Sequence, residues 1–204
     1  PQHVNIHFYE NLDTKKSFVH LSGNYKNVAA SDPEPLIEPL ASYVDIENTK
    51  AIASYAPEYK FRYWAESISS EWKEPSIAIK ARTKNIDSMA VTLKSNRNAS
   101  RIILLLPEAS KLKSFNIGSQ TINVSPSTSG PFKGYYSIYL NGVYDKQIDL
   151  ILNFENYTKK TKGYLMDIST KLPGHLDEIY QARSGIFSPV HRGDQAILIK
   201  TVTI

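Results

Sequence analysis

The 204-residue sequence has no cysteine and no long hydrophobic run. Without cysteine, a disulfide framework, a thiol nucleophile and cysteine-ligated zinc are excluded. The compartment stays open, because a domain of this size folds without disulfides. The longest apolar run is Ile102 to Leu106, whereas a membrane span needs ~20 apolar residues. The sequence shows no signal-peptide pattern and begins at Pro1 in strand-like sequence, so we expect a processed protein or a fragment of a longer one.

Local catalytic motifs are also missing. The sequence has no His-Glu-x-x-His zinc motif and no Gly-x-Ser-x-Gly nucleophile elbow. The glycine-containing stretch from Gly130 to Gly134 lacks the spacing of a phosphate-binding loop, and its proline removes an N–H that such a loop needs. A glycosidase stays open, because carboxylates carried by separate strands leave no local motif.

The charge balance is mildly basic. Lys and Arg number 24 against 20 Asp and Glu, which gives a net charge of +4. The basic residues are spread along the chain, and the densest run is only Lys159 to Lys162. This pattern is typical of solvated loops, and we expect no nucleic-acid partner.

The composition is that of a folded β protein. At 41% hydrophobic and 22% charged residues, the chain has enough apolar surface for a core and too little net charge for disorder. Tyrosine, phenylalanine and tryptophan are plentiful and suit sheet faces.

Short strand-like segments recur along the chain with Gly, Pro, Asn and Ser between them. This pattern predicts an all-β fold, a β-sandwich or jelly roll, formed by a single domain over residues 1–204. We expect strands at Val4–Tyr9, Ser17–Leu21, Phe61–Ala65, Ser76–Ala81, Met89–Leu93, Arg101–Leu106, Leu112–Ile117, Gln120–Val124, Tyr135–Leu140, Ile148–Phe154, Gly163–Ile168 and Ala196–Ile204.

Two hairpins and one helix complete the expectation. The turn at Asn11–Thr14 joins the first two strands, and Gly118 allows a tight turn between Ile117 and Gln120. A cap at Ser31 or Asp32, followed by prolines, predicts a short helical insertion near residues 33–44.

Histidines, tryptophans and carboxylates provide the candidate site residues. His7 and His20 face each other across the first hairpin if its register is regular, but two histidines alone make a weak metal site. Trp64 and Trp72 are candidate ligand contacts, because exposed aromatic faces stack on sugar rings. Their neighbours Glu66, Glu71 and Glu74 also fit a sugar site, whereas the simpler interpretation is a core aromatic and a solvated loop.

Two further patterns carry less information. Arg192-Gly193-Asp194 spells an integrin-type tripeptide, but a turn into the last strand explains it better. N-glycosylation sequons occur at Asn98, Asn123 and Asn156. Roughly two are expected by chance at this composition, so they do not establish glycosylation.

The order of several segments resembles a known family. These segments are the opening hairpin from Pro1, the stretches Pro75–Ile77, Val91–Arg97 and Arg101–Leu106, the hairpin at Phe115–Ser119, and an ending that contains Asp167, Leu172-Pro173, Arg183, Pro189 and Gly193-Asp194. Together they resemble the C-terminal, non-catalytic domain of membrane-anchored zinc aminopeptidases, the relatives of vacuolar membrane protease and of the endoplasmic-reticulum metallopeptidase. The resemblance covers most of the chain and is weakest over residues 23–60.

The resemblance implies a non-catalytic accessory domain with a structural or interaction role. This chain would then be no enzyme, would hold no cofactor, and would lie outside the cytoplasm, anchored through the membrane segments of its parent. Zinc would belong to the peptidase domain of the parent protein. The partners of this chain would be that peptidase domain and the membrane spans of the same polypeptide, and a homo-oligomer is also possible under this resemblance. The alternatives are a secreted carbohydrate-binding module that uses Trp64 and Trp72, and a β-sandwich hydrolase.

Overall fold

The structure is a computed structural model that describes residues 3–24, 63–82, 87–129, 132–157, 160–184 and 193–204. Its Cα atoms cluster into two compact units. Unit 1 comprises Pro1–Glu71 and Ser169–Ile197, and unit 2 comprises Trp72–Ile168 and Leu198–Ile204. None of the helices in the described ranges has the length and apolarity that a membrane crossing requires.

Unit 1 is built on an antiparallel hairpin. Strands β1 (His3–Asn11) and β2 (Lys16–Asn24) pair in a regular register that places Phe8 opposite Val19. Asn11 closes the turn, because its Oδ1 accepts hydrogen bonds from the N–H groups of Asp13 (3.0 Å) and Thr14 (3.1 Å). Strand β3 (Tyr63–Ser67) pairs with β2, and β1 adjoins β12 (Gln195–Thr203), whose first residues belong to this unit.

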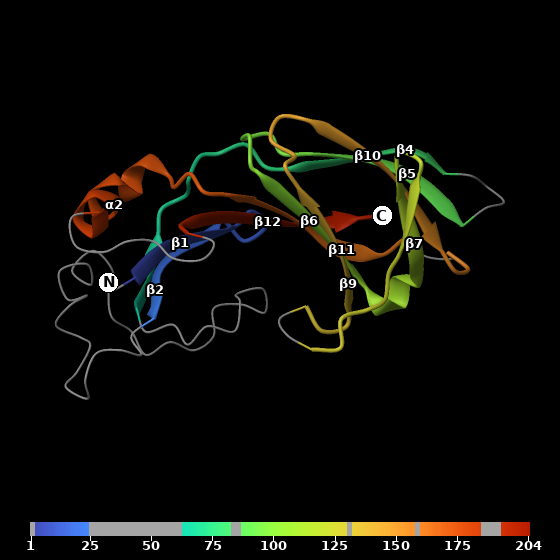
Figure 1. The fold of residues 1–204 in the computed structure, drawn as a ribbon, viewed down its shortest axis with the longest axis horizontal. Coiled ribbons are helices and arrows are strands. Elements are labelled where there is room, and N and C mark those ends of the chain that lie inside the picture. Colours follow the sequence, from blue (N-terminus) through green and yellow to red (C-terminus); the bar gives the residue numbers. More distant parts are fainter. Residues whose placement is uncertain (1–2, 25–62, 83–86, 130–131, 158–159, 185–192) are drawn as a thin grey trace. The chain divides into compact units, whose positions relative to one another are not determined.

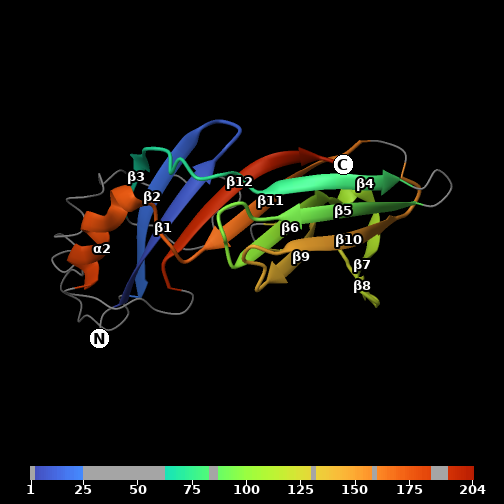
Figure 2. The same ribbon diagram turned by 90° about the horizontal axis from the view of Figure 1, so that it is seen from above.

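Unit 1 also contains a short helical segment, which precedes β12 in the sequence. The single turn η2 (Gly174–Leu176) leads into α2 (Asp177–Ser184), which carries acidic residues in its first turn and Arg183 in its last. This charge order suits the helix dipole. Leu176 of η2 and Ile179 of α2 are buried, so this segment packs through a narrow apolar face. Figure 2 shows α2 in the same unit as β1, β2 and β3.

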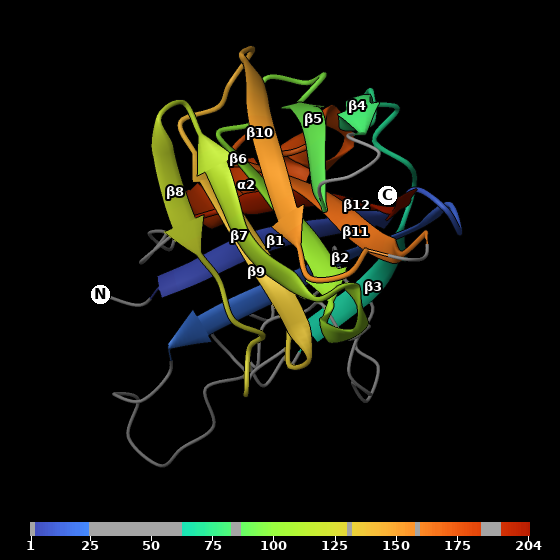
Figure 3. The same cartoon turned by 90° about the vertical axis from the view of Figure 1, so that its right-hand side faces the viewer.

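Unit 2 is a two-sheet sandwich. One sheet has the order β12, β11, β6, β9, where β12 contributes its residues from Leu198 onward. The other has the order β4, β5, β10, β7, β8, and its strands lie side by side in Figure 3. The bounds are β4 (Ser76–Arg82), β5 (Ser88–Lys94), β6 (Arg101–Pro107), β7 (Leu112–Ile117), β8 (Gln120–Asn123), β9 (Tyr135–Asn141), β10 (Gln147–Phe154) and β11 (Lys162–Ser169).

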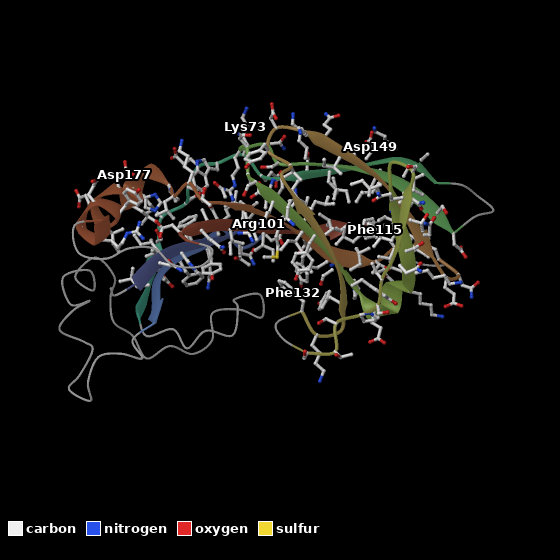
Figure 4. The ribbon with its side chains drawn as sticks, viewed as in Figure 1. Lys73, Arg101, Phe115, Phe132, Asp149 and Asp177 are labelled. Atoms are coloured by element: carbon white, nitrogen blue, oxygen red, sulfur yellow. The ribbon has the colours of Figure 1, made fainter. Side chains whose placement is uncertain are left out.

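The core of unit 2 lies between these sheets. Along β10 the side chains alternate, with Leu150, Leu152 and Phe154 buried and the residues between them turned outward. Phe115 points into the sandwich and Asp149 lies on its outer surface (Figure 4). The other core members include Met89, Val91, Leu93, Ile102, Leu104, Leu106, Ile138, Leu140 and Leu165.

The molecule is therefore an all-β sandwich, as the sequence predicts. Each of the twelve expected strands is present, although Phe61 and Arg62 lie outside the described residues. The tight turn at Gly118 is also confirmed, since Gly118 has φ +56° and Ile117 pairs with Gln120. The helical insertion near residues 33–44 falls outside the described residues, and the helix that is described, α2, was not expected. The expectation of one domain over residues 1–204 stays a prediction.

Candidate functional site

The charged residues at the end of the chain form a buried pair in unit 1. Arg183, at the end of α2, directs two N–H groups at Asp194, with Nη1 to Oδ1 at 2.7 Å and Nη2 to Oδ2 at 2.5 Å. Asp194 Oδ1 also accepts the backbone N–H of Ile6 at 2.9 Å. The side chains are 2% and 9% exposed, so the pair is shielded from solvent. It joins α2 and the approach to β12 to β1, which lies 188 positions away from Asp194 at Ile6.

His7 lies in the same buried region of unit 1. Burial lowers its pKa to about 4, although the Asp194 carboxylate and the backbone of Gly193 oppose that shift. His7 is therefore neutral at pH 7. The expected register is confirmed, since His7 is opposite His20. Within the described ranges, no group of three or more His, Asp or Glu residues is arranged to hold a metal ion.

A second buried pair lies in unit 2. Arg97 Nε donates to Asp167 Oδ1 at 2.8 Å and Nη2 donates to the Asp167 backbone carbonyl at 3.2 Å. Ser95 Oγ donates to Asp167 Oδ2 at 2.8 Å. Burial raises the pKa of Asp167, and the Arg97 charge and the Ser95 hydrogen bond oppose that rise. The pair joins the turn after β5 to β11.

The candidate ligand contacts are Trp64 and Trp72. Trp72 is half-buried, and the Arg97 guanidinium lies 4.6 Å from its ring centroid. One face of the indole is thus occupied by the arginine that binds Asp167. Trp64 lies in β3 of unit 1, opposite His20, and its side chain falls outside the described residues. Their role as ligand contacts stays a prediction.

The three neighbouring carboxylates belong to different parts of the fold. Glu66 is in β3, and Glu71, the last residue of the first segment of unit 1, has a left-handed conformation with φ +57°. Glu74, in unit 2, accepts a hydrogen bond from Lys200 Nζ at 2.7 Å. The negative charge of Glu74 is therefore paired with the positive charge of a lysine of β12.

Sequence reasoning missed a contact between a serine and a histidine in unit 1. Ser67 Oγ lies 2.9 Å from His175 Nε2, and burial lowers the pKa of His175 while Glu10 opposes that shift. Glu10 is itself engaged, since its Oε1 accepts the hydroxyl of Ser69 at 2.5 Å and its Oε2 accepts the N–H of Ser70 at 3.2 Å. The contact ties η2 to β3.

The sequence could not have indicated this contact. Ser67 and His175 are 108 positions apart, and neither lies in a recognisable motif. The same separation hides the role of Glu10, which accepts from residues of the segment that follows β3. Only the fold of unit 1 brings these polar groups together.

The two remaining sequence patterns have different environments. Asp194 of the Arg-Gly-Asp tripeptide is 8% exposed and paired internally, which favours the turn interpretation; Arg192 lies outside the described residues. The asparagines of the three sequons, Asn98, Asn123 and Asn156, are exposed. Exposure alone does not distinguish a modified asparagine from an unmodified one.

Comparison with known proteins adds little. No protein-family model matches the chain, and no curated protein matches it. Among solved structures, it is similar to the Fcho1 Mu homology domain of Danio rerio with a bound Eps15 peptide. The two are 9% identical with a TM-score of 0.30, over 98% of this chain and 92% of the other. At that score the likeness carries no argument about function.

Proposed function

We propose that this chain is a non-catalytic accessory module of a membrane-bound zinc aminopeptidase. The module has a structural role or mediates interactions, and it acts beside the peptidase domain of the same polypeptide. In this proposal the module lies outside the cytoplasm, anchored through the membrane segments of the parent, and zinc belongs to the peptidase domain. The proposal rests on the resemblance of the segment order and, above all, on how the ending of the chain uses its charges.

The observation that supports the proposal is the engagement of the charged residues in that ending. Asp167, Arg183 and Asp194 are all buried, and each takes part in an ion pair inside its own unit. Groups held in this way orient strands and a helix and are not presented to a substrate. The residues that carry the resemblance therefore have the environment expected of a scaffold.

Two measurements test the proposal. The chain of residues 1–204 is assayed for zinc by mass spectrometry and for cleavage of aminoacyl-nitroanilides, and the complete reading frame that encodes it is assayed in parallel. We expect the complete protein to show activity that a chelator removes, and the 204-residue chain to show neither activity nor stoichiometric zinc. Stoichiometric zinc with peptide cleavage by the chain alone, or a reading frame without a peptidase domain, would contradict the proposal.

A carbohydrate-binding module is the second candidate, and one observation favours it. Trp72 is only half-buried, so part of its side chain is accessible to a sugar ring that stacks on aromatic surface. A glycan-array screen with Trp72→Ala and Trp72→Phe separates the candidates. Binding that Trp72→Ala removes and Trp72→Phe retains would establish the sugar site, and unchanged binding would remove its main support.

A further inference from the structure

The three edge strands of the sheets in unit 2 differ in how they resist pairing with another strand. Edge strands usually carry a charge, a proline or a bulge, or are very short. Strand β4 has Lys80 and a register shift between Ile79 and Ala81, and β8 has only four residues. Strand β9 has seven residues, no charge, no proline and an unbroken register against β6.

The backbone groups of β9 alternate in direction. Tyr135 is opposite Pro107, which has no N–H, and Tyr135 instead donates to the carbonyl of Phe132 and accepts from the N–H of Ser127. Its backbone groups thus point away from β6. Seven residues on, the N–H of Gly142 donates to the carbonyl of Ser100, which precedes β6. Even positions therefore face β6 and odd positions face the edge.

Three residues consequently present their N–H and C=O groups to the edge of the sheet. They are Ser137, Tyr139 and Asn141, and of the described strands only β6 pairs with β9 (Figure 2). Tyr139 is 54% exposed, and Asn141 is exposed as well. The edge thus combines backbone groups that pair with no other strand of the described ranges with an exposed aromatic side chain.

We propose that β9 is the surface through which two copies of this chain associate, antiparallel and about a two-fold axis at Tyr139. In this register Tyr139 is opposite Tyr139 of the second copy, and Ser137 is opposite Asn141, so the outward backbone groups of both strands are matched. No charged residue lies in β9, so the pairing brings no like charges together. A second copy fits this edge because the same three residues supply both sides.

The pairing has a predictable strength. A single strand pair buries less than the ~1,600 Å² of a standard interface, so the dimer forms at micromolar to submillimolar concentration. Tyr139→Pro removes an N–H that β6 does not use, and proline is tolerated on the outward side of an edge strand. Each dimer loses the two hydrogen bonds at its axis, which weakens association about tenfold or more.

Sedimentation equilibrium of the full chain over a concentration series tests the proposal. The wild-type mass should rise above the 23.0 kDa of one chain toward twice that value, and Tyr139→Pro and Tyr139→Lys should stay nearer to monomer. Tyr144→Lys, which replaces an exposed tyrosine beyond β9 (50% exposed), is the matched control and should associate like wild type. The lysine variant keeps the test valid if the proline variant misfolds.

Two outcomes would overturn the proposal. The first is a wild-type chain that stays monomeric at every concentration up to several hundred micromolar. The second is a dimer that both Tyr139 variants retain or that Tyr144→Lys weakens equally, because the contact would then lie elsewhere. The outcome is independent of whether the parent protein is a peptidase.

Discussion

Each unit of the molecule buries an arginine–aspartate pair, and the two pairs are built differently. In unit 1, Asp194 accepts two guanidinium N–H groups and one backbone N–H. In unit 2, Asp167 receives one guanidinium N–H at its side chain and one hydroxyl, and its arginine also contacts the Asp167 carbonyl and the ring of Trp72. The first pair is bidentate, whereas in the second only one guanidinium N–H reaches the carboxylate. Both arginines also lie over an aromatic ring, Arg183 at 5.1 Å from Tyr180 and Arg97 at 4.6 Å from Trp72.

The difference lies in where each carboxylate sits. Asp194 directly precedes β12, and it ties the end of α2 to the backbone of Ile6 in β1. Asp167 lies within β11, opposite Ile102 of β6, and burial raises its pKa. A carboxyl with a raised pKa takes up a proton more readily when its arginine is removed. The two pairs should therefore respond differently to the same substitution.

Arg183→Met should produce the largest loss of stability. It leaves the Asp194 carboxylate buried without its guanidinium, and breaking one side of a buried pair costs about 3–5 kcal/mol of the free energy of unfolding. Denaturant titration at pH 7 measures the loss. Lys80→Met, at an exposed pair, is the control and should change little. A loss below about 1 kcal/mol for Arg183→Met would mean that the bidentate pair is not needed for the fold.

His7 makes the stability of unit 1 depend on pH. Its pKa is about 4 in the fold against 6.5 for an ordinary histidine, so between these values the unfolded chain binds the extra proton. Stability should fall as the pH drops from 6.5 to 4, by about 3 kcal/mol in total. His7→Gln should remove this part of the pH dependence, measured as the difference between the two proteins at pH 7 and pH 4. Identical slopes would show that His7 titrates normally.

Arg97→Met should cost less than Arg183→Met at pH 7, near the lower end of the about 3–5 kcal/mol for breaking a buried pair, because Asp167 can take up a proton. Without Arg97 the pKa of Asp167 rises further above its ordinary value, because the charge that opposes the rise is gone. Here the folded state binds the extra proton, so stability recovers as the pH falls through the folded pKa. Unfolding at pH 7 and pH 5 measures the recovery. A loss that is equal at both pH values would break the proposed contrast between the two pairs.

The strands were predictable because their signal is local. Alternation along β10 and apolar runs such as Ile102–Leu106 require only neighbouring residues, and Gly118 marks its turn by itself. The helix α2 was missed because it is eight residues long and follows a proline-glycine turn that is typical of loops.

The buried pairs could not be predicted in the same way. Asp167 and Arg97 are 70 positions apart, and Asp194 contacts the backbone of Ile6 across 188 positions. A charged residue in a strand is normally an outward one, so the sequence of β11 gives no sign that Asp167 points inward. The ending of the chain was singled out for its resemblance, whereas its pairing depends on the three-dimensional arrangement.

Trp72→Ala should cause the smallest loss of stability, and it tests whether the indole ring supports the Arg97–Asp167 pair. The indole lies 4.6 Å from the Arg97 guanidinium, and such a contact at a half-buried site contributes about 1 kcal/mol. If the ring acts on the pair, its removal should cost less in an Arg97→Met background than in wild type, and a double-mutant cycle at pH 7 measures that coupling. Trp72→Phe keeps an aromatic face and should retain most of the coupling. A cost that is unchanged by Arg97→Met would show that Trp72 packs independently of the arginine, and its ring would then be the better candidate for a ligand contact.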